Sequence, residues 1–192
     1  MPLREHWGLK IYNHKKRGMI LPLIALSAIS FADCAGISDV GGDGCAGILK
    51  AVVIDTKTKH MWLCQAGSSF RGYAVAIGSG GPDKQKEGDN KTPLGIYALG
   101  SPRPSGEGFH TFIPIDFPRE DQKRKGFNGG KIGIHGPPES WKWLGSTTTW
   151  VNWTRGCIAV GSIDEIIEIA DWVRTNQVKE VILRPGHSLT AT

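Results

Sequence analysis

Ile132-Gly133-Ile134-His135-Gly136 and Thr154-Arg155-Gly156-Cys157-Ile158-Ala159-Val160 stand apart from the rest of this sequence. Each stretch sets one reactive side chain, His135 or Cys157, among β-forming residues with a glycine beside it. A nucleophilic cysteine needs a base within hydrogen-bonding reach and backbone amides directed at the developing oxyanion. We therefore predict that Cys157 is the nucleophile and His135 the base. Gly156 would let the chain turn so that the amides of residues 156 and 157 face the site. An imidazolium beside Cys157 would also lower the pKa of its thiol.

Both stretches lie on predicted strands, residues 131–135 and 157–160, and further strand-like segments flank them along the chain. Those segments are residues 48–55, 60–64, 70–77, 94–99, 111–115 and 178–183. The first two are separated by Thr56-Lys57-Thr58-Lys59, which predicts a hairpin. The polar residues 78–92 and the tryptophan-containing residues 136–153 are predicted to be loops.

A single helix is predicted from Ile163 to Arg174. Ser162 and Glu165 form the S-x-x-E pattern of a capping box, which satisfies free amides in the first turn. The apolar residues expected to share one face are Ile163, Ile166, Ile167, Ala170 and Val173. The whole pattern indicates a mainly β domain with one packed helix.

The positive charge of the chain is concentrated near its start. The net charge is +5 and the pI is about 9.1, and residues 1–32 contribute five Lys or Arg against Glu5. Lys15-Lys16-Arg17, the apolar run 19–30 and the small residues around Ala32 predict a secretory signal peptide over residues 1–32. The basic pI is therefore no argument for nucleic-acid binding, and we expect an exported protein of the periplasm or cell envelope. The alternatives for this region are an uncleaved N-terminal anchor, a buried hydrophobic strand, and lipidation at Cys34.

The chain contains four cysteines, at positions 34, 45, 64 and 157. If Cys157 stays a thiol, one of the other three has no partner within the chain. Cys34 with Cys45 and Cys45 with Cys64 are both natural disulfides in an oxidising compartment, and the sequence leaves the pairing open. Residues 33–47 are rich in glycine and are predicted to form a lead-in to the domain.

The pair His135-Gly136 followed by Thr154-Arg155-Gly156-Cys157-Ile158 resembles the signature of the L,D-transpeptidase (YkuD-like) catalytic domains. Gly88-Asp89-Asn90-Lys91-Thr92-Pro93-Leu94-Gly95-Ile96-Tyr97 resembles the Thr-Pro-x-Gly-aromatic stretch of the same family. The opening hairpin matches as well. The resemblance covers residues 48–184, which leaves residues 185–192 as a tail, and it implies a two-sheet β-sandwich with one packed α-helix.

The resemblance also implies a reaction. Cys157 would attack the carbonyl before a D-amino acid in a peptidoglycan stem peptide, and His135 would move the protons. An amine from a second stem peptide would complete transpeptidation, whereas water would complete hydrolysis as an L,D-carboxypeptidase or amidase, or release a wall-linked lipoprotein. No metal or organic cofactor is implied.

Several positions depart from the family pattern or carry a substrate-binding expectation. Arg155 stands where many members have a second histidine, and it is expected to hold a substrate carboxylate. Thr154, Gly136 and Trp153 are the other expected substrate-binding residues. Ala159 replaces the usual Asn or Arg. The four tryptophans of the 136–153 loop, at 141, 143, 150 and 153, are expected to divide between a lid or platform and a small satellite core.

Other functions are left open by the sequence. A catalytically silent wall-binding module would keep wall binding after loss of Cys157, and a secreted antibacterial toxin could use the same domain. The lysines of the 78–92 loop, Lys84, Lys86 and Lys91, are expected to be solvated charges. No histidine has a companion at metal-ligand spacing, so a zinc site is not expected. The sequence does not indicate an oligomeric state.

Overall fold

We describe the fold from a computed structural model in which residues 44–186 are defined. The predicted signal peptide, Cys34 and residues 187–192 of the predicted tail lie outside these described residues. The strands are β1 Lys50–Asp55, β2 His60–Gln65, β3 Ser68–Ala76, β4 Gly95–Ala98, β5 Arg103–Pro104, β6 Thr111–Pro114, β7 Gly133–His135, β8 Ile158–Val160 and β9 Glu180–Arg184. The helices are α1 Glu120–Arg124, the 3-10 segment η1 Glu139–Thr149, and α2 Ile163–Thr175.

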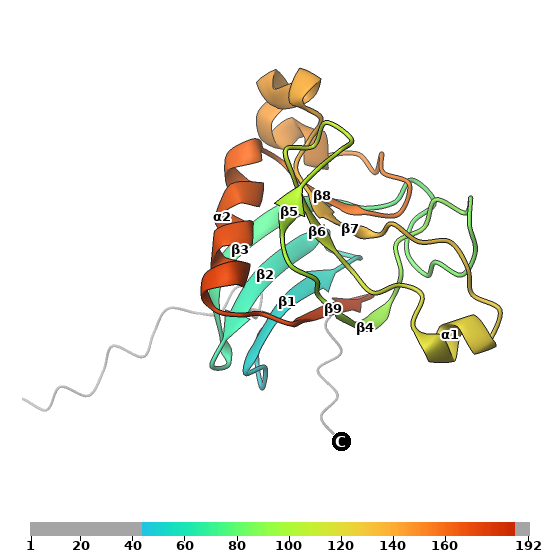
Figure 1. The fold of residues 1–192 in the computed structure, drawn as a ribbon. Coiled ribbons are helices and arrows are strands. Elements are labelled where there is room, and N and C mark those ends of the chain that lie inside the picture. The colour runs from blue at the N-terminus through green and yellow to red at the C-terminus, as the bar shows by residue number, and fades with distance from the viewer. Residues whose placement is uncertain (1–43, 187–192) are drawn as a thin grey trace, which may run out of the picture. The chain divides into compact units, whose positions relative to one another are not determined.

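The strands form one mixed, curled sheet in the order β4-β9-β1-β2-β3-β8-β7-β6-β5 (Figure 1). β1 and β2 form the predicted hairpin. β3 joins the two halves of the sheet, because residues 68–74 pair with β2 whereas Val75 and Ala76 pair with β8. The mainly β fold is confirmed, and the two expected sheets are the two halves of this one sheet.

The curl brings strands from opposite ends of the sheet together. Leu99, just after β4, bridges Ile115, just after β6. The amide of Gly100 donates to the carbonyl of Pro114, and the amide of Asp116 donates to the carbonyl of Ala98. The inner faces of both halves therefore enclose one hydrophobic core, in which side chains such as Ile54, Leu63, Ile113 and Ile134 are fully buried.

α2 covers this core and begins as predicted. The hydroxyl of Ser162 accepts the amide of Glu165 at 3.2 Å. The Glu165 carboxylate accepts the amide of Gly161 at 2.7 Å, one residue earlier than in a standard capping box. The predicted apolar face is wrong in part, because Ile163 and Ile167 are only half-buried. The buried residues of the helix are Ile166, Ile169, Ala170, Trp172 and Val173.

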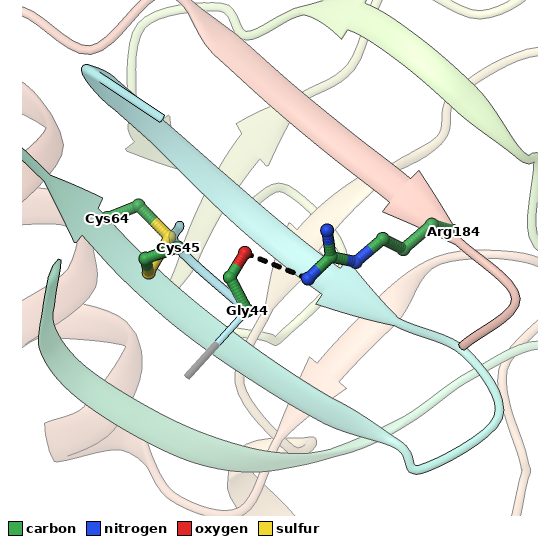
Figure 2. Close-up of a disulfide and its surroundings, with 4 residues drawn as sticks. All are labelled: Gly44, Cys45, Cys64 and Arg184. Atoms are coloured by element: carbon green, nitrogen blue, oxygen red, sulfur yellow. Dashed lines mark hydrogen bonds between the residues drawn. A yellow bond between two sulfur atoms is a disulfide. The ribbon is translucent and has the colours of Figure 1, made fainter. Parts of the chain in front are cut away.

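The outer face of β1 and β2 has a small core of its own, to which Cys45, in the described part of the lead-in, contributes. Cys45 forms a disulfide with Cys64 of β2, with 5.2 Å between their Cα atoms (Figure 2). The Arg184 guanidinium donates to the carbonyl of Gly44 at 2.8 Å. These two contacts tie the start of the described chain to β2 and β9, and they resolve the pairing that the sequence left open.

The predicted 136–153 loop contains the whole of η1, which the sequence did not indicate. Gly145 interrupts this segment with a positive φ of 54°, so η1 consists of two short helical pieces that meet at a kink. Within residues 44–186, none of the helices has both the length and the apolar character needed to cross a bilayer.

Candidate active site

β7 and β8 are parallel neighbours, and they bring the two predicted reactive residues to one cleft. His135 is the register partner of Ala159. Side chains alternate along a strand, so Cys157, two residues before Ala159, projects from the same face of the sheet as His135. Both residues line a cleft of about 900 Å³. Trp153, Thr154 and Arg155 line it as well.

The turn before Cys157 is held by its own side chains. The Thr154 hydroxyl donates to the carbonyl of Cys157 at 2.6 Å and accepts the amide of Gly156 at 3.1 Å. The hydroxyl that was expected to contact substrate is therefore used inside the turn. The Gly156 amide, which the sequence predicts to face the oxyanion, donates to this hydroxyl instead.

Gly156 is packed against residues 91 and 92 at the end of the 78–92 loop, and we call these two residues the strap. The Thr92 hydroxyl donates to the carbonyl of Gly156 at 3.0 Å and accepts the amide of Gly78 at 2.8 Å. Gly156 has a φ of +124°, and a Cβ atom there would lie 2.5 Å from the carbonyl oxygen of Lys91. Both the backbone conformation and the close approach require glycine immediately before Cys157.

His135 is oriented by the next residue in the chain. Its Nδ1 lies 2.6 Å from the carbonyl oxygen of Gly136. A carbonyl only accepts hydrogen bonds, so Nδ1 carries the proton and Nε2 presents a lone pair. A Cβ atom on Gly136 would lie 3.0 Å from Cγ2 of Ile166, so glycine lets α2 pack close. Gly136, an expected substrate-binding residue, therefore orients the imidazole of His135 and is not among the residues that line the cleft.

Aromatic rings enclose His135 on two sides. The ring of Phe109 stacks on the imidazole with a centroid distance of 4.2 Å, and Trp153 meets it edge-on at 5.7 Å. Trp141 in turn contacts Trp153 at 5.1 Å. Trp143 and Trp150 are largely exposed, so the four tryptophans divide into two exposed side chains and two, Trp141 and Trp153, that pack together.

The electrostatic environment keeps both reactive groups neutral. Burial lowers the pKa of His135, although its bond to Gly136 opposes the shift. Burial likewise raises the pKa of the Cys157 thiol to about 11, against a smaller lowering effect of a hydrogen bond that the sulfur receives from the backbone of Gly133. The thiol lies 3.4 Å from the carbonyl oxygen of Lys131, to which it donates. The expected imidazolium that would lower the thiol pKa is therefore not the resting state.

The charged residues of the cleft are Lys84, Lys131 and Arg155 against Glu87 and Glu107. Arg155 is exposed and makes no ion pair with another described residue. Lys84 is buried and paired with Asp89, which corrects the expectation that it is a solvated charge. Among residues 44–186, no three His, Cys, Asp or Glu side chains are grouped closely enough to hold a metal ion.

Sequence reasoning missed two parts of this site. Phe109 lies in an irregular segment with no pattern that points to His135. Thr92 belongs to the quoted Thr-Pro-x-Gly stretch, but the stretch alone does not say that its hydroxyl reaches Gly156. Both contacts join residues that are far apart in the chain.

Comparison with known proteins places this geometry in a family. The YkuD family model, described as the L,D-transpeptidase catalytic domain, matches residues 49–182. A comparison with curated protein sequences finds no match.

Solved structures give the same fold. The helical cell shape determining protein Pgp2 from Campylobacter jejuni matches with a TM-score of 0.60 and 24% identity, over 75% of this chain and 50% of that one. Bdellovibrio bacteriovorus Bd1075 matches with a TM-score of 0.50 and 21% identity, over 71% of this chain and 48% of that one. This chain thus spans about half the length of the structures it matches. Because the family match covers most of its length, the chain belongs to the YkuD family of L,D-transpeptidase catalytic domains.

Proposed function

We propose that this protein is a cysteine-dependent L,D-transpeptidase that acts on peptidoglycan stem peptides through a thioester on Cys157. The observation that carries the proposal is the tautomer of His135. Its Nδ1 proton is held by the carbonyl of Gly136, so the Nε2 lone pair is free in the cleft that also contains the thiol. Such a pair suits general-base activation of a neutral nucleophile.

The proposed reaction begins with proton transfer from the Cys157 thiol to Nε2 of His135. The sulfur bonds to the carbonyl carbon of the residue before the terminal D-amino acid, and negative charge develops on the carbonyl oxygen. We assign stabilisation of that oxyanion to the amide of Cys157, because the Gly156 amide already donates to Thr154. The imidazolium then protonates the leaving amine as the carbon–nitrogen bond breaks.

The thioester is resolved by a second nucleophile. For transpeptidation this is an amine of another stem peptide, whose attack releases the Cys157 sulfur and forms a cross-link. The signal-peptide pattern in residues 1–32 supports a location in the periplasm or cell envelope, where this substrate occurs. No cofactor enters the scheme.

Hydrolysis of the thioester by water is the second candidate, giving an L,D-carboxypeptidase or amidase. It is favoured by Ala159, whose methyl group is buried beside His135 in the next strand. A methyl group provides no hydrogen bond with which to hold an acceptor peptide. The similarity in fold to a cell-shape-determining protein is compatible with either outcome.

Incubation of the purified protein with disaccharide tetrapeptide, followed by mass spectrometry, tests the proposal. We expect loss of D-Ala together with a cross-linked dimer, and neither product from Cys157→Ala. Loss of D-Ala without a dimer would assign the hydrolase instead. Wall binding by both proteins without any product would indicate a silent binding module and contradict the proposal.

A further inference from the structure

Lys84 is a buried cation on the wall of the catalytic cleft. It lines the cleft together with His135 and Cys157, yet only 4% of its side chain is exposed. Its ammonium group donates to Oδ1 of Asp89 at 2.7 Å and to the carbonyl of Lys86 at 3.0 Å. The ammonium is therefore fixed in place before any substrate arrives.

The partner of Lys84 is itself held firmly by the backbone. The Asp89 carboxylate accepts the amides of Gln85, Lys86 and Lys91 at 2.9 to 3.0 Å. Burial alone would raise the pKa of Asp89, but the hydrogen bonds from Lys84 and these amides lower it well below its usual value. Asp89 is thus a permanent anion that does not depend on Lys84 alone for its position.

The hydrogen-bond capacity of Lys84 is not used up by these contacts. A lysine ammonium has three N–H donors, and its contacts with described residues use two of them. The other cations of the cleft, Lys131 and Arg155, are exposed and long. Ordering an exposed lysine or arginine costs rotamer entropy, whereas Lys84 is already ordered. A preorganised donor in a partly enclosed cleft binds an anion more tightly than a mobile surface charge does.

We propose that the third N–H of Lys84 binds a carboxylate of the donor stem peptide. This inference rests on the proposed function. Next to the bond that Cys157 would attack, a stem peptide offers two such groups, the terminal carboxylate of its D-amino acid and the side-chain carboxylate of meso-diaminopimelate. Both groups are carboxylates and would form the same hydrogen bond with Lys84. The experiment below distinguishes which of the two is bound.

The electrostatics of the nucleophile agree with this placement. Burial has the largest effect on the pKa of Cys157 and raises it, whereas the charge of Lys84 is among the smaller effects that lower it. Lys84 and Cys157 also line the same cleft, so a carboxylate bound at Lys84 would share that cleft with the thiol.

The proposal is tested by removing the charge of the peptide carboxylate and, separately, the charge of Lys84. Calorimetry would measure the dissociation constant of a tetrapeptide, its C-terminal carboxamide and its diaminopimelate side-chain amide. The proteins are full-length Cys157→Ala and the same chain with Lys84→Met. We expect one amide to bind about 10- to 100-fold more weakly than the tetrapeptide, as loss of a charged hydrogen bond implies, and this amide identifies the carboxylate. In the Lys84→Met protein, the affinity for the tetrapeptide should fall by a similar factor, and amidation of the peptide should not lower the affinity further.

Controls separate binding from folding. Methionine keeps most of the volume of the lysine stem, and Asp89 keeps its three amide donors, so the loop should stay folded. Lys123→Met removes an exposed lysine that pairs with Glu120 outside the cleft, and it should leave all three affinities unchanged. The carboxamide peptides test the contact without altering the protein at all.

The outcomes distinguish this inference from the proposed function. Two outcomes overturn the inference. One is that Lys84→Met weakens the binding of all three peptides equally. The other is that the Cys157→Ala protein, which retains Lys84, shows no measurable binding of the tetrapeptide. If the peptide affinities follow the expected pattern but the protein with Cys157 intact shows no turnover, the carboxylate site is supported and the transpeptidase is contradicted. If this protein turns over the substrate but amidation of neither carboxylate weakens binding selectively, the transpeptidase is supported and the carboxylate site is contradicted.

Discussion

At the scale of single residues, the thiol of Cys157 and the imidazole of His135 are both held neutral by burial. A thiol with a pKa of about 11 is protonated at neutral pH. In the proposed reaction, activation therefore depends on proton transfer to Nε2 during attack and not on a preformed thiolate–imidazolium pair. The orientation of the imidazole that this step needs comes from the backbone carbonyl of Gly136.

This state predicts the pH dependence of thiol reactivity. The alkylation rate of Cys157 by iodoacetamide should rise steadily with pH towards 11, because the thiolate fraction grows until the pH passes the raised pKa. Peptide mapping by mass spectrometry would follow Cys157 alone, with Cys157→Ala as the blank. A plateau reached near pH 7 would instead indicate an ion pair and contradict the neutral state.

Activity itself should be limited at low pH by His135. Because burial lowers the pKa of this histidine, the neutral base persists below the usual histidine range and is lost as the pH falls through the lowered value. The acid limb of the kcat/KM profile should therefore lie below pH 6.5. Phe109→Ala would expose the imidazole to water and should move this limb to higher pH. An unchanged profile would argue against the role of burial.

Gly156 provides a third prediction for a single residue. Gly156→Ala should destabilise the protein by about 1–3 kcal/mol and abolish most activity, because alanine is strained at this φ and its Cβ atom meets the Lys91 carbonyl. Gly106→Ala is the matched control, since nothing lies within 4 Å of its added Cβ atom. Urea unfolding and turnover would be measured for both. Equal stability of the two variants would show that the strap relaxes.

At the scale of secondary structure elements, the disulfide fastens the lead-in to β2 across 19 residues. A cross-link closing a loop of this size contributes about 3 kcal/mol by restricting the unfolded chain. The double variant Cys45→Ala/Cys64→Ala should therefore unfold at a lower urea concentration. Its turnover should be normal while it remains folded, because neither cysteine lines the cleft. Cys157→Ala should show the opposite pattern, with stability retained and turnover lost.

At the scale of the whole molecule, the buried Lys84–Asp89 pair links global stability to pH. The lowered pKa of Asp89 means that its carboxylate stabilises the folded state above the unfolded pKa of about 4. This contribution is lost as the pH falls towards the folded value. Asp89→Asn should therefore be less stable than wild type at pH 7, and the difference should shrink below about pH 4.

Urea midpoints between pH 3 and 7 would measure this difference. Asp171→Asn is the control, because Asp171 pairs with Arg174 on the exposed surface and such pairs contribute little. A constant gap between wild type and Asp89→Asn at all pH values would mean that the carboxylate charge is not the source of the stability.

The amino-acid sequence by itself determined the local elements and the identity of the two reactive residues. Period-two runs of apolar residues and the Ser162 cap depend on near neighbours, so all eight predicted strands and α2 are found close to their predicted positions. His135 and Cys157 were recognisable because each stands in a short pattern with glycine. Tertiary structure decided that these residues share one cleft, which follows from the parallel pairing of β7 with β8. It also decided their protonation, the seating of Gly156 on Thr92, and the burial of Lys84. Those properties depend on desolvation and on contacts between segments that are distant in the chain, and local sequence patterns carry no information about either.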